Sequence, residues 1–284
     1  MKELDIVKND PYFSELIKKN NLDDKHIIEH INSFLRVLES RNKCLNCKGL
    51  YMCNQRSKGQ RLSLDYKNVL LEEIEYCEYS LRELKKKKLL NDYVYCDVPE
   101  NLSEIDLDNV SYTKDQEELY ALLLGLLHDK SDKGLYICGD LGVGKTYLCT
   151  ALANSLVKNK KKVAFVKVSN FFNQMKADVI NNSELVDKNI NALKSSDYLI
   201  LDDIGSEAVS AFVRDDILFR ILDYRLENKL ITIFTSNLNK DELLKHYQYD
   251  RKEKSNLMNA KRLVERIDIL TDDYVLSGKN MRRL

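Results

Sequence analysis

Residues 139–146 read Gly-Asp-Leu-Gly-Val-Gly-Lys-Thr and match the pattern G-x-x-x-x-G-K-[ST]. The glycines allow a loop to turn successive backbone N–H groups toward a phosphate. A short apolar segment, 135–138, precedes this loop, and an amphipathic segment, 147–158, follows it. The loop therefore joins a predicted strand to a predicted helix, and the positive N-terminal end of that helix would face the same phosphate. The alternative, a chance match in a glycine turn, does not require this context.

The side chains of this phosphate-binding loop (P-loop) indicate a nucleotide and a metal. Lys145 would reach the β- and γ-phosphate oxygens, and the Thr146 hydroxyl would be a ligand of Mg²⁺. We therefore expect ATP and Mg²⁺ as cofactors. The residues predicted to contact the nucleotide are Gly139, Asp140, Leu141, Gly142, Val143, Gly144, Lys145, Thr146 and Tyr147.

The part of the chain beyond residue 110 alternates between apolar strands and amphipathic helices. Near-continuous apolar strands that are separated by helices are typical of a parallel sheet covered on both faces. We therefore predict an α/β fold for this part. The predicted strands cover 135–138, 163–166, 198–201, 230–234 and 274–276, and the predicted helices include 147–158 and 212–227.

Two of these strands end in polar side chains. Asp202 and Asp203 follow the strand 198–201, and Asn237 closely follows the strand 230–234. The carboxyl ends of parallel strands meet at one edge of a sheet, where α/β proteins bind ligands. We expect Asp202 to hold Mg²⁺ through water, Asp203 to orient the attacking water, and Asn237 to reach the γ-phosphate or that water. The alternative for each is a strand that leaves into a turn, where Asp and Asn are common.

The composition is that of a globular protein with balanced charge. Of the 284 residues, 44% are hydrophobic and 32% are charged, and 45 basic residues balance 45 acidic ones. No global positive charge indicates nucleic acid as a partner, although a local basic surface stays open. The longest apolar run, 120–127, is too short to cross a bilayer, and the N-terminus lacks the pattern of a secretory signal. We therefore expect a cytoplasmic protein with no membrane partner.

The first hundred residues are predicted to form a small, mainly helical domain. Apolar residues recur at helical spacing in 26–38 and again in 67–84. A lysine run, 85–88, and weakly periodic residues after it mark a change of character. The predicted domains are 1–100, with a tether at about 85–105, and 101–284.

Four cysteines lie close together in this first domain. Cys44 and Cys47 form a C-x-x-C pair, and Cys53 and Cys77 follow them along the chain. Disulfides are rare in the cytosol, so the cluster indicates a structural Zn²⁺ site with four thiolate ligands. A bound metal would also stabilise a domain whose hydrophobic core is small. The alternative is that some of these cysteines are buried free thiols.

The motifs of the second domain resemble those of the AAA+ ATPases. The sequences at 202–205, 235–237 and 262–267 look like the bacterial helicase-loader branch of that superfamily. The resemblance is strong over the second domain and looser over the first hundred residues. It implies a P-loop AAA+ domain with a parallel sheet between helices, preceded by a small, mainly helical, zinc-binding domain.

The resemblance also implies roles for individual residues. The residues that it places in the two Walker motifs are Lys145, Thr146, Asp202 and Asp203. Asn237 would be the first sensor, Arg282 the second, and Arg266 an arginine finger that reaches the γ-phosphate of a neighbouring subunit. The alternative for Arg266 is an exposed helix face with acidic partners. A shorter Asp203 in place of a glutamate favours slow hydrolysis.

A loader of this kind binds the hexameric replicative DNA helicase through its N-terminal domain. It places that helicase on single-stranded DNA at replication initiation or restart, while its ATPase domains associate with one another. One alternative is the helper ATPase of an insertion-sequence transposase, which acts on duplex DNA; the cysteine-bearing domain argues against it. Another is an adaptor that does not hydrolyse ATP; an intact P-loop argues against that.

For DNA contact the sequence offers only a candidate helix around Phe171, Phe172 and Lys176. The alternative is that this helix packs both aromatic rings into the core.

Overall fold

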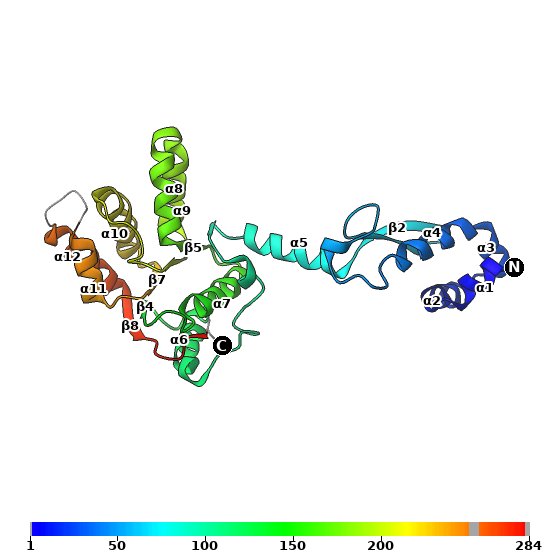
Figure 1. Ribbon diagram of the computed structural model, residues 1–284, viewed down its shortest axis with the longest axis horizontal. Coiled ribbons are helices and arrows are strands. Elements are labelled where there is room, and N and C mark those ends of the chain that lie inside the picture. Colours follow the sequence, from blue (N-terminus) through cyan, green and yellow to red (C-terminus); the bar gives the residue numbers. More distant parts are fainter. Residues whose placement is uncertain (1, 250–255, 282–284) are drawn as a thin grey trace. The chain divides into compact units, whose positions relative to one another are not determined.

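The computed structural model describes residues 2–249 and 256–281 (Figure 1). The chain forms two compact units, Met1–Lys87 and Lys88–Leu284, and helix α5 (Glu78–Asn91) runs through the division. Among the described residues, every helix falls short of the length and hydrophobicity that a membrane span needs.

The first unit packs short helices against a two-stranded antiparallel hairpin. Helix α2 begins after Asp10, whose side chain accepts hydrogen bonds from the backbone N–H groups of Tyr12 and Phe13. The rings of Phe13 and Phe34 then meet edge to face at 5.1 Å in a small apolar core, to which Leu64 of the hairpin also belongs. The elements are α1 (Lys2–Asn9), α2 (Pro11–Asn20), α3 (Asp24–Glu29), α4 (Ile31–Asn42), the 3₁₀ turn η1 (Leu50–Met52), β1 (Gln60–Tyr66) and β2 (Leu70–Tyr76).

The segment 67–84, predicted as one helix, instead forms strand β2 and the beginning of α5. Asn68 adopts a left-handed φ of 64° between the two strands, a conformation that asparagine tolerates better than most residues. The Lys67 N–H donates to the Val69 carbonyl at 3.0 Å and closes the turn. Pairing with β1 satisfies the backbone of β2, whose side chains are mostly exposed, so its apolar residues do not mark a buried face. The helix prediction is therefore wrong over the strand.

The second unit is built on a six-stranded sheet with the order β3-β5-β6-β7-β4-β8, and all its pairings are parallel. The predicted α/β fold with a parallel sheet is confirmed. The strands are β3 (Tyr95–Cys96), β4 (Gly134–Cys138), β5 (Val163–Lys167), β6 (Tyr198–Asp202), β7 (Ile231–Ser236) and β8 (Thr271–Val275). The helices are α6 (Glu117–Leu127), α7 (Lys145–Lys158), α8 (Val168–Asn181), α9 (Ser183–Ser195), the π-helix η4 (Phe212–Leu218), α10 (Phe219–Glu227), α11 (Lys240–Gln248) and α12 (Leu257–Leu270), with 3₁₀ turns η2 (Glu100–Leu102) and η3 (Lys114–Gln116).

The short strand β3 places the end of the predicted first domain in the second unit. β3 pairs with β5, and the Asp97 N–H continues the ladder by donating to the Phe165 carbonyl at 2.8 Å. The boundary therefore lies at Lys87 rather than at residue 100. The lysine run 85–88 belongs to the regular helix α5, not to an irregular tether.

Helices cover both faces of the sheet. α6 and α7 pack on one face, and α8 to α12 pack on the other (Figure 1). The α8 side chains Phe171 and Phe172 are each 1% exposed, and Tyr95 of β3 meets the Phe171 ring edge to face at 5.3 Å. The core-packing alternative for these two rings is therefore confirmed. Lys176 lies on the same helix and is partly exposed.

Candidate nucleotide-binding site

The loop between β4 and α7 has the backbone of a phosphate cradle. Gly144 precedes the helix with a φ of 102°, which L side chains rarely adopt. A Cβ atom at Gly144 would also lie 2.3 Å from Nε2 of Gln116. That buried amide donates to the Val143 carbonyl at 2.7 Å and so holds the loop from behind. Glycine is required here both by dihedral angle and by space.

Lys145 begins α7 and points back into the loop. Its Nζ donates to the carbonyls of Gly139 and Asp140 at 2.7 and 2.9 Å, and to Oδ1 of Asn237 at 2.9 Å. Burial lowers the pKa of Lys145, although the carboxylates of Asp203 and other neighbours act against that shift. The ammonium group is thus preorganised among oxygens, and phosphate oxygens can replace these acceptors.

Asp202, at the end of β6, lies beside the P-loop hydroxyl. Its Oδ1 accepts from Oγ1 of Thr146 at 2.8 Å and from Oγ1 of Thr235 at 2.7 Å. Asp202 is only 4% exposed, and burial raises its pKa while the two hydroxyl hydrogen bonds act in the opposite direction. A hydroxyl beside a carboxylate is a donor set that suits Mg²⁺, so both residues fit the predicted metal.

Asp203 turns its carboxylate toward the end of the neighbouring strand. It adopts a left-handed φ of 60°, and its N–H donates to Oγ1 of Thr235 at 2.9 Å. Nδ2 of Asn237 donates to Oδ1 of Asp203 at 3.0 Å. Because Asn237 also accepts from Lys145, a chain of hydrogen bonds joins the P-loop lysine to this second acid. The geometry places a carboxylate and an amide where they can orient a water molecule.

These groups line one pocket of about 760 Å³. Of the predicted contact residues, Leu141, Gly142, Gly144, Lys145, Thr146 and Tyr147 line it, together with Asp202, Asp203 and Asn237. Gly139 and Asp140 contribute carbonyls to Lys145 instead, and Val143 is buried. The lining residues that the sequence analysis did not assign to the site are Asp97, Pro99, Asn101, Leu102, Ser111, Gln116, Lys167, Thr235 and Met281.

One of these unassigned residues, Lys167, could have been predicted from the sequence. Lys167 ends β5 and stands in register with Asp202 on β6, so the argument from strand ends applies to it as well. The residues between Asp97 and Ser111 carried none, since they follow a two-residue strand and have no regular period.

Arg266 lies away from this pocket. On α12 its Nε donates to Oδ1 of Asp223 at 3.1 Å, and its guanidinium lies 4.5 Å from the centre of the Phe219 ring. The side chain is 20% exposed. A finger that acts on a neighbouring subunit need not line its own pocket, so the role of Arg266 stays a prediction. Arg282, the predicted second sensor, lies outside the described residues.

The four clustered cysteines line a single pocket of about 230 Å³ in the first unit. Nε2 of Gln55 approaches Sγ of Cys44 at 3.1 Å, and the Gly59 N–H approaches Sγ of Cys53 at 3.4 Å. N–H donors of this kind also support thiolates around structural metals. Even so, no three Cys, His, Asp or Glu side chains in the described ranges are arranged to hold a metal. The residues fit Zn²⁺ in type and in location, but not in spacing.

A parallel sheet with a P-loop, an acid pair on one strand end and an asparagine on the next defines an ATP-binding protein of the AAA+ class. The chain belongs to the family described as IstB-like ATP binding protein, whose model matches residues 50–274.

One relative resembles nearly the whole chain, and two solved structures resemble about two thirds of it. It is 28% identical over 285 residues to "Replicative helicase loader DnaI" of Bacillus subtilis (strain 168), which covers 97% of this chain and 91% of the relative. A crystal structure of DnaI is similar with a TM-score of 0.56 and 28% identity, over 68% of this chain and 98% of that one. A primosome component from Streptococcus pyogenes serotype M3 gives a TM-score of 0.54 and 29% identity, over 70% and 100%.

Proposed function

We propose that this protein is an ATP-dependent loader of the hexameric replicative DNA helicase, acting at replication initiation or restart. The observation that carries the proposal is the extent of the similarity to a helicase loader, which covers 97% of the chain and therefore both units. The ATP site described above supplies the nucleotide dependence.

The family description also fits the alternative, the helper ATPase of an insertion-sequence transposase. The family model begins at residue 50 and so omits helices α1 to α4, whereas the similarity to the loader covers 97% of the chain and so extends into the N-terminal unit. Because the N-terminal unit separates the two functions, we favour the loader.

The chain's own residues define the chemistry that we propose. Lys145 neutralises charge on the β- and γ-phosphates, and Thr146 and Asp202 hold Mg²⁺. Held by these two residues, the metal would supply positive charge to offset the negative charge that develops on the phosphate oxygens. Asp203 and Asn237 orient the attacking water, and the shorter reach of Asp203 makes turnover slow.

Further elements of the proposal rest on sequence resemblance. We infer that the N-terminal unit binds the helicase, that the ATPase units self-associate with Arg266 as the finger, and that single-stranded DNA is contacted during loading. The shared pocket of the four cysteines supports a structural Zn²⁺ in the N-terminal unit. The cytoplasm stays the expected compartment.

Native mass spectrometry with the same organism's replicative helicase tests the proposal. We expect a discrete complex between this protein and the helicase in the presence of ATP and Mg²⁺. Lys145→Ala removes the phosphate-binding ammonium group, so the fraction of helicase that carries this variant should differ from the fraction that carries the wild type. No complex in any nucleotide state, together with ATP-dependent binding to duplex DNA, would establish the transposase-helper function instead.

A further inference from the structure

One wall of the nucleotide pocket differs in chemistry from the rest. The residues of this wall are Asp97, Pro99, Asn101, Leu102 and Ser111. They offer apolar surface and neutral or acidic polar groups, whereas the P-loop part of the lining holds the ammonium group of Lys145. A triphosphate needs cations and a nucleobase needs a flat apolar contact with few polar groups. If ATP is the ligand, as the proposed function requires, its base and ribose face this wall.

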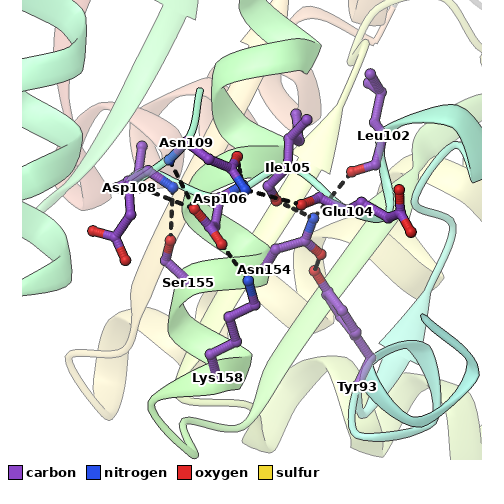
Figure 2. Close-up of polar contacts among 11 residues, drawn as sticks. Tyr93, Leu102, Glu104, Ile105, Asp106, Asp108, Asn109, Asn154, Ser155 and Lys158 are labelled. Carbon is purple, nitrogen blue, oxygen red and sulfur yellow. Dashed lines mark hydrogen bonds and ion pairs between the residues drawn. The ribbon is translucent and has the colours of Figure 1, made fainter. Parts of the chain in front are cut away.

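The wall has little backbone structure of its own. Between Asp97 and Thr113 its only regular element is the 3₁₀ turn Glu100–Leu102. Short 3₁₀ turns have poor hydrogen-bond geometry and do not fix a segment by themselves. Side chains from α7 supply the missing bonds, and Figure 2 shows them converging on the segment.

The central contact is the carboxamide of Asn154, which is 0% exposed. Its Nδ2 donates to the carbonyl of Leu102 at 3.1 Å and to the carbonyl of Ile105 at 2.6 Å (Figure 2). Its Oδ1 accepts from the hydroxyl of Tyr93 at 2.6 Å. Both N–H bonds of the amide are thus used, and the tyrosine hydroxyl fixes which way the amide points. Leu102 itself lines the pocket, so Asn154 holds the wall at a lining residue.

Two further side chains of α7 also bind the wall segment. Oγ of Ser155 accepts from the N–H of Leu107 at 2.9 Å, and Lys158 pairs with the carboxylate of Asp106 (Figure 2). Oδ1 of Asp106 in turn accepts from the N–H groups of Asp108 and Asn109 at 3.0 and 2.9 Å, which shapes the following turn. The segment is therefore held mainly by α7, and the Tyr120 hydroxyl of α6 adds a hydrogen bond to the Leu107 carbonyl at 2.9 Å.

We propose that Asn154 is a positioning residue for nucleotide recognition: through Leu102 it sets the wall that contacts the base and ribose. The helix that carries Asn154 begins at Lys145, nine residues earlier and about 14 Å away along the axis. A single rigid helix thus fixes the distance between the phosphate end and the base end of the pocket. The inference rests on the proposed use of ATP, and Asn154 touches no nucleotide itself.

The test compares two Tyr→Phe variants of the full-length protein. Tyr93→Phe removes the hydroxyl that orients Asn154 and keeps the ring in the core. Tyr198→Phe is the matched control, since its hydroxyl lies within hydrogen-bond distance of the Leu126 carbonyl and the Asp129 carboxylate, and neither residue lines the pocket. Affinities for ATP and for inorganic tripolyphosphate, which lacks base and ribose, are measured by competition against a fluorescent nucleotide.

We expect Tyr93→Phe to weaken ATP binding several-fold and to leave tripolyphosphate binding unchanged. The limit is about tenfold, reached if the whole free energy of the lost hydrogen bond is needed to re-form the wall when ATP binds. Tyr198→Phe should change neither affinity. Asn154→Ala should act in the same direction and more strongly, and Tyr93→Phe carries the test should that variant fail to fold.

Two results would overturn the positioning role. One is an unchanged ATP affinity in Tyr93→Phe, and the other is an equal loss for ATP and tripolyphosphate, which would indicate general damage to the site. A wild-type protein that binds tripolyphosphate and ATP equally would overturn the base contact itself. A wild-type protein that binds neither would overturn the nucleotide site and, with it, the proposed function.

Discussion

Asp202 is a carboxylate that is almost fully buried, with 4% of its surface exposed. The hydroxyls of Thr146 and Thr235 are its hydrogen-bond partners, and neither carries a charge that would offset its own. Burial therefore raises the pKa of Asp202 above its ordinary value of 3.8. A buried carboxylate without a cation is unfavourable, and Mg²⁺ would remove that penalty.

The sign of this effect gives a pH-dependent prediction for Asp202→Asn. With a raised pKa the folded state holds the proton more tightly than the unfolded state, so stability falls as pH rises from about 4 through the folded value. Asparagine does not ionise and escapes this loss. We expect Asp202→Asn to raise the free energy of unfolding of the metal-free second unit at pH 7 and to raise it less at pH 4. Chemical denaturation at the two pH values measures the difference.

The same variant should lose Mg²⁺-dependent ATP hydrolysis, because the carboxylate that holds the metal is gone. Asp203→Asn serves as the control for the stability measurement. This neighbouring carboxylate is less buried, so its removal should give no comparable gain in the free energy of unfolding. A lower free energy of unfolding for Asp202→Asn at pH 7 would contradict the argument.

Some residues of this site could be predicted from the sequence, and others could not. Asp202 and Asn237 end predicted strands, so the shared edge of a parallel sheet predicted their proximity, and the structure joins both to the P-loop. Gln116 holds the P-loop from a turn more than twenty residues upstream, and its role depends on the folded arrangement alone. Local patterns report strand ends but not partners that only packing brings together.

The prediction of strands from the sequence has the same limit: local patterns do not report contacts that only folding brings about. The long buried strands were predicted well because parallel strands covered on both faces are almost wholly apolar. β3 contains only two residues, which are too few to show any period. The pocket wall begins directly after it, at Asp97. Strand β2 resembled a helix because most of its side chains are exposed, so its apolar residues show no alternation between a buried and a solvent face.

The cysteine segment between α4 and β1 supports a prediction about metal. Its only regular element is the turn η1, so little backbone pairing fixes it without a ligand. If Zn²⁺ binds, the four sulfurs must close around it, and the protein should purify with about one zinc per chain. Cys47→Ser should reduce that content and destabilise the first unit, because the energy of metal binding contributes to folding. Elemental analysis and thermal unfolding measure both effects.

Cys96→Ser is the matched control for this experiment. Cys96 is also partly buried, but it belongs to β3 of the second unit and is not one of the four clustered cysteines. It should keep the zinc content of the wild type. A wild-type protein that contains no zinc and takes none up, or a Cys47→Ser variant that unfolds like the wild type, would favour buried thiols instead.

At the scale of the whole molecule, the question is whether one chain completes its own active site. The described pocket supplies the P-loop, both acids and the asparagine, while Arg266 lies on α12 outside its lining. Arg262, one turn earlier, places its guanidinium 4.6 Å from the centre of the same Phe219 ring. The two arginines therefore share a local environment, and Arg262→Ala is a control for packing losses in Arg266→Ala.

If Arg266 serves a neighbouring subunit, two inactive variants should restore each other. Arg266→Ala keeps its pocket, so it should bind ATP normally and lose hydrolysis by about 10³-fold, the usual effect of losing an arginine finger. Lys145→Ala cannot hold phosphate but still presents Arg266. A mixture of the two forms interfaces in which an intact pocket meets an intact finger, and turnover should rise well above that of either variant alone. Activity that stays at the sum of the separate variants would show that Arg266 acts within its own chain, where its pairing with Asp223 makes it a structural residue.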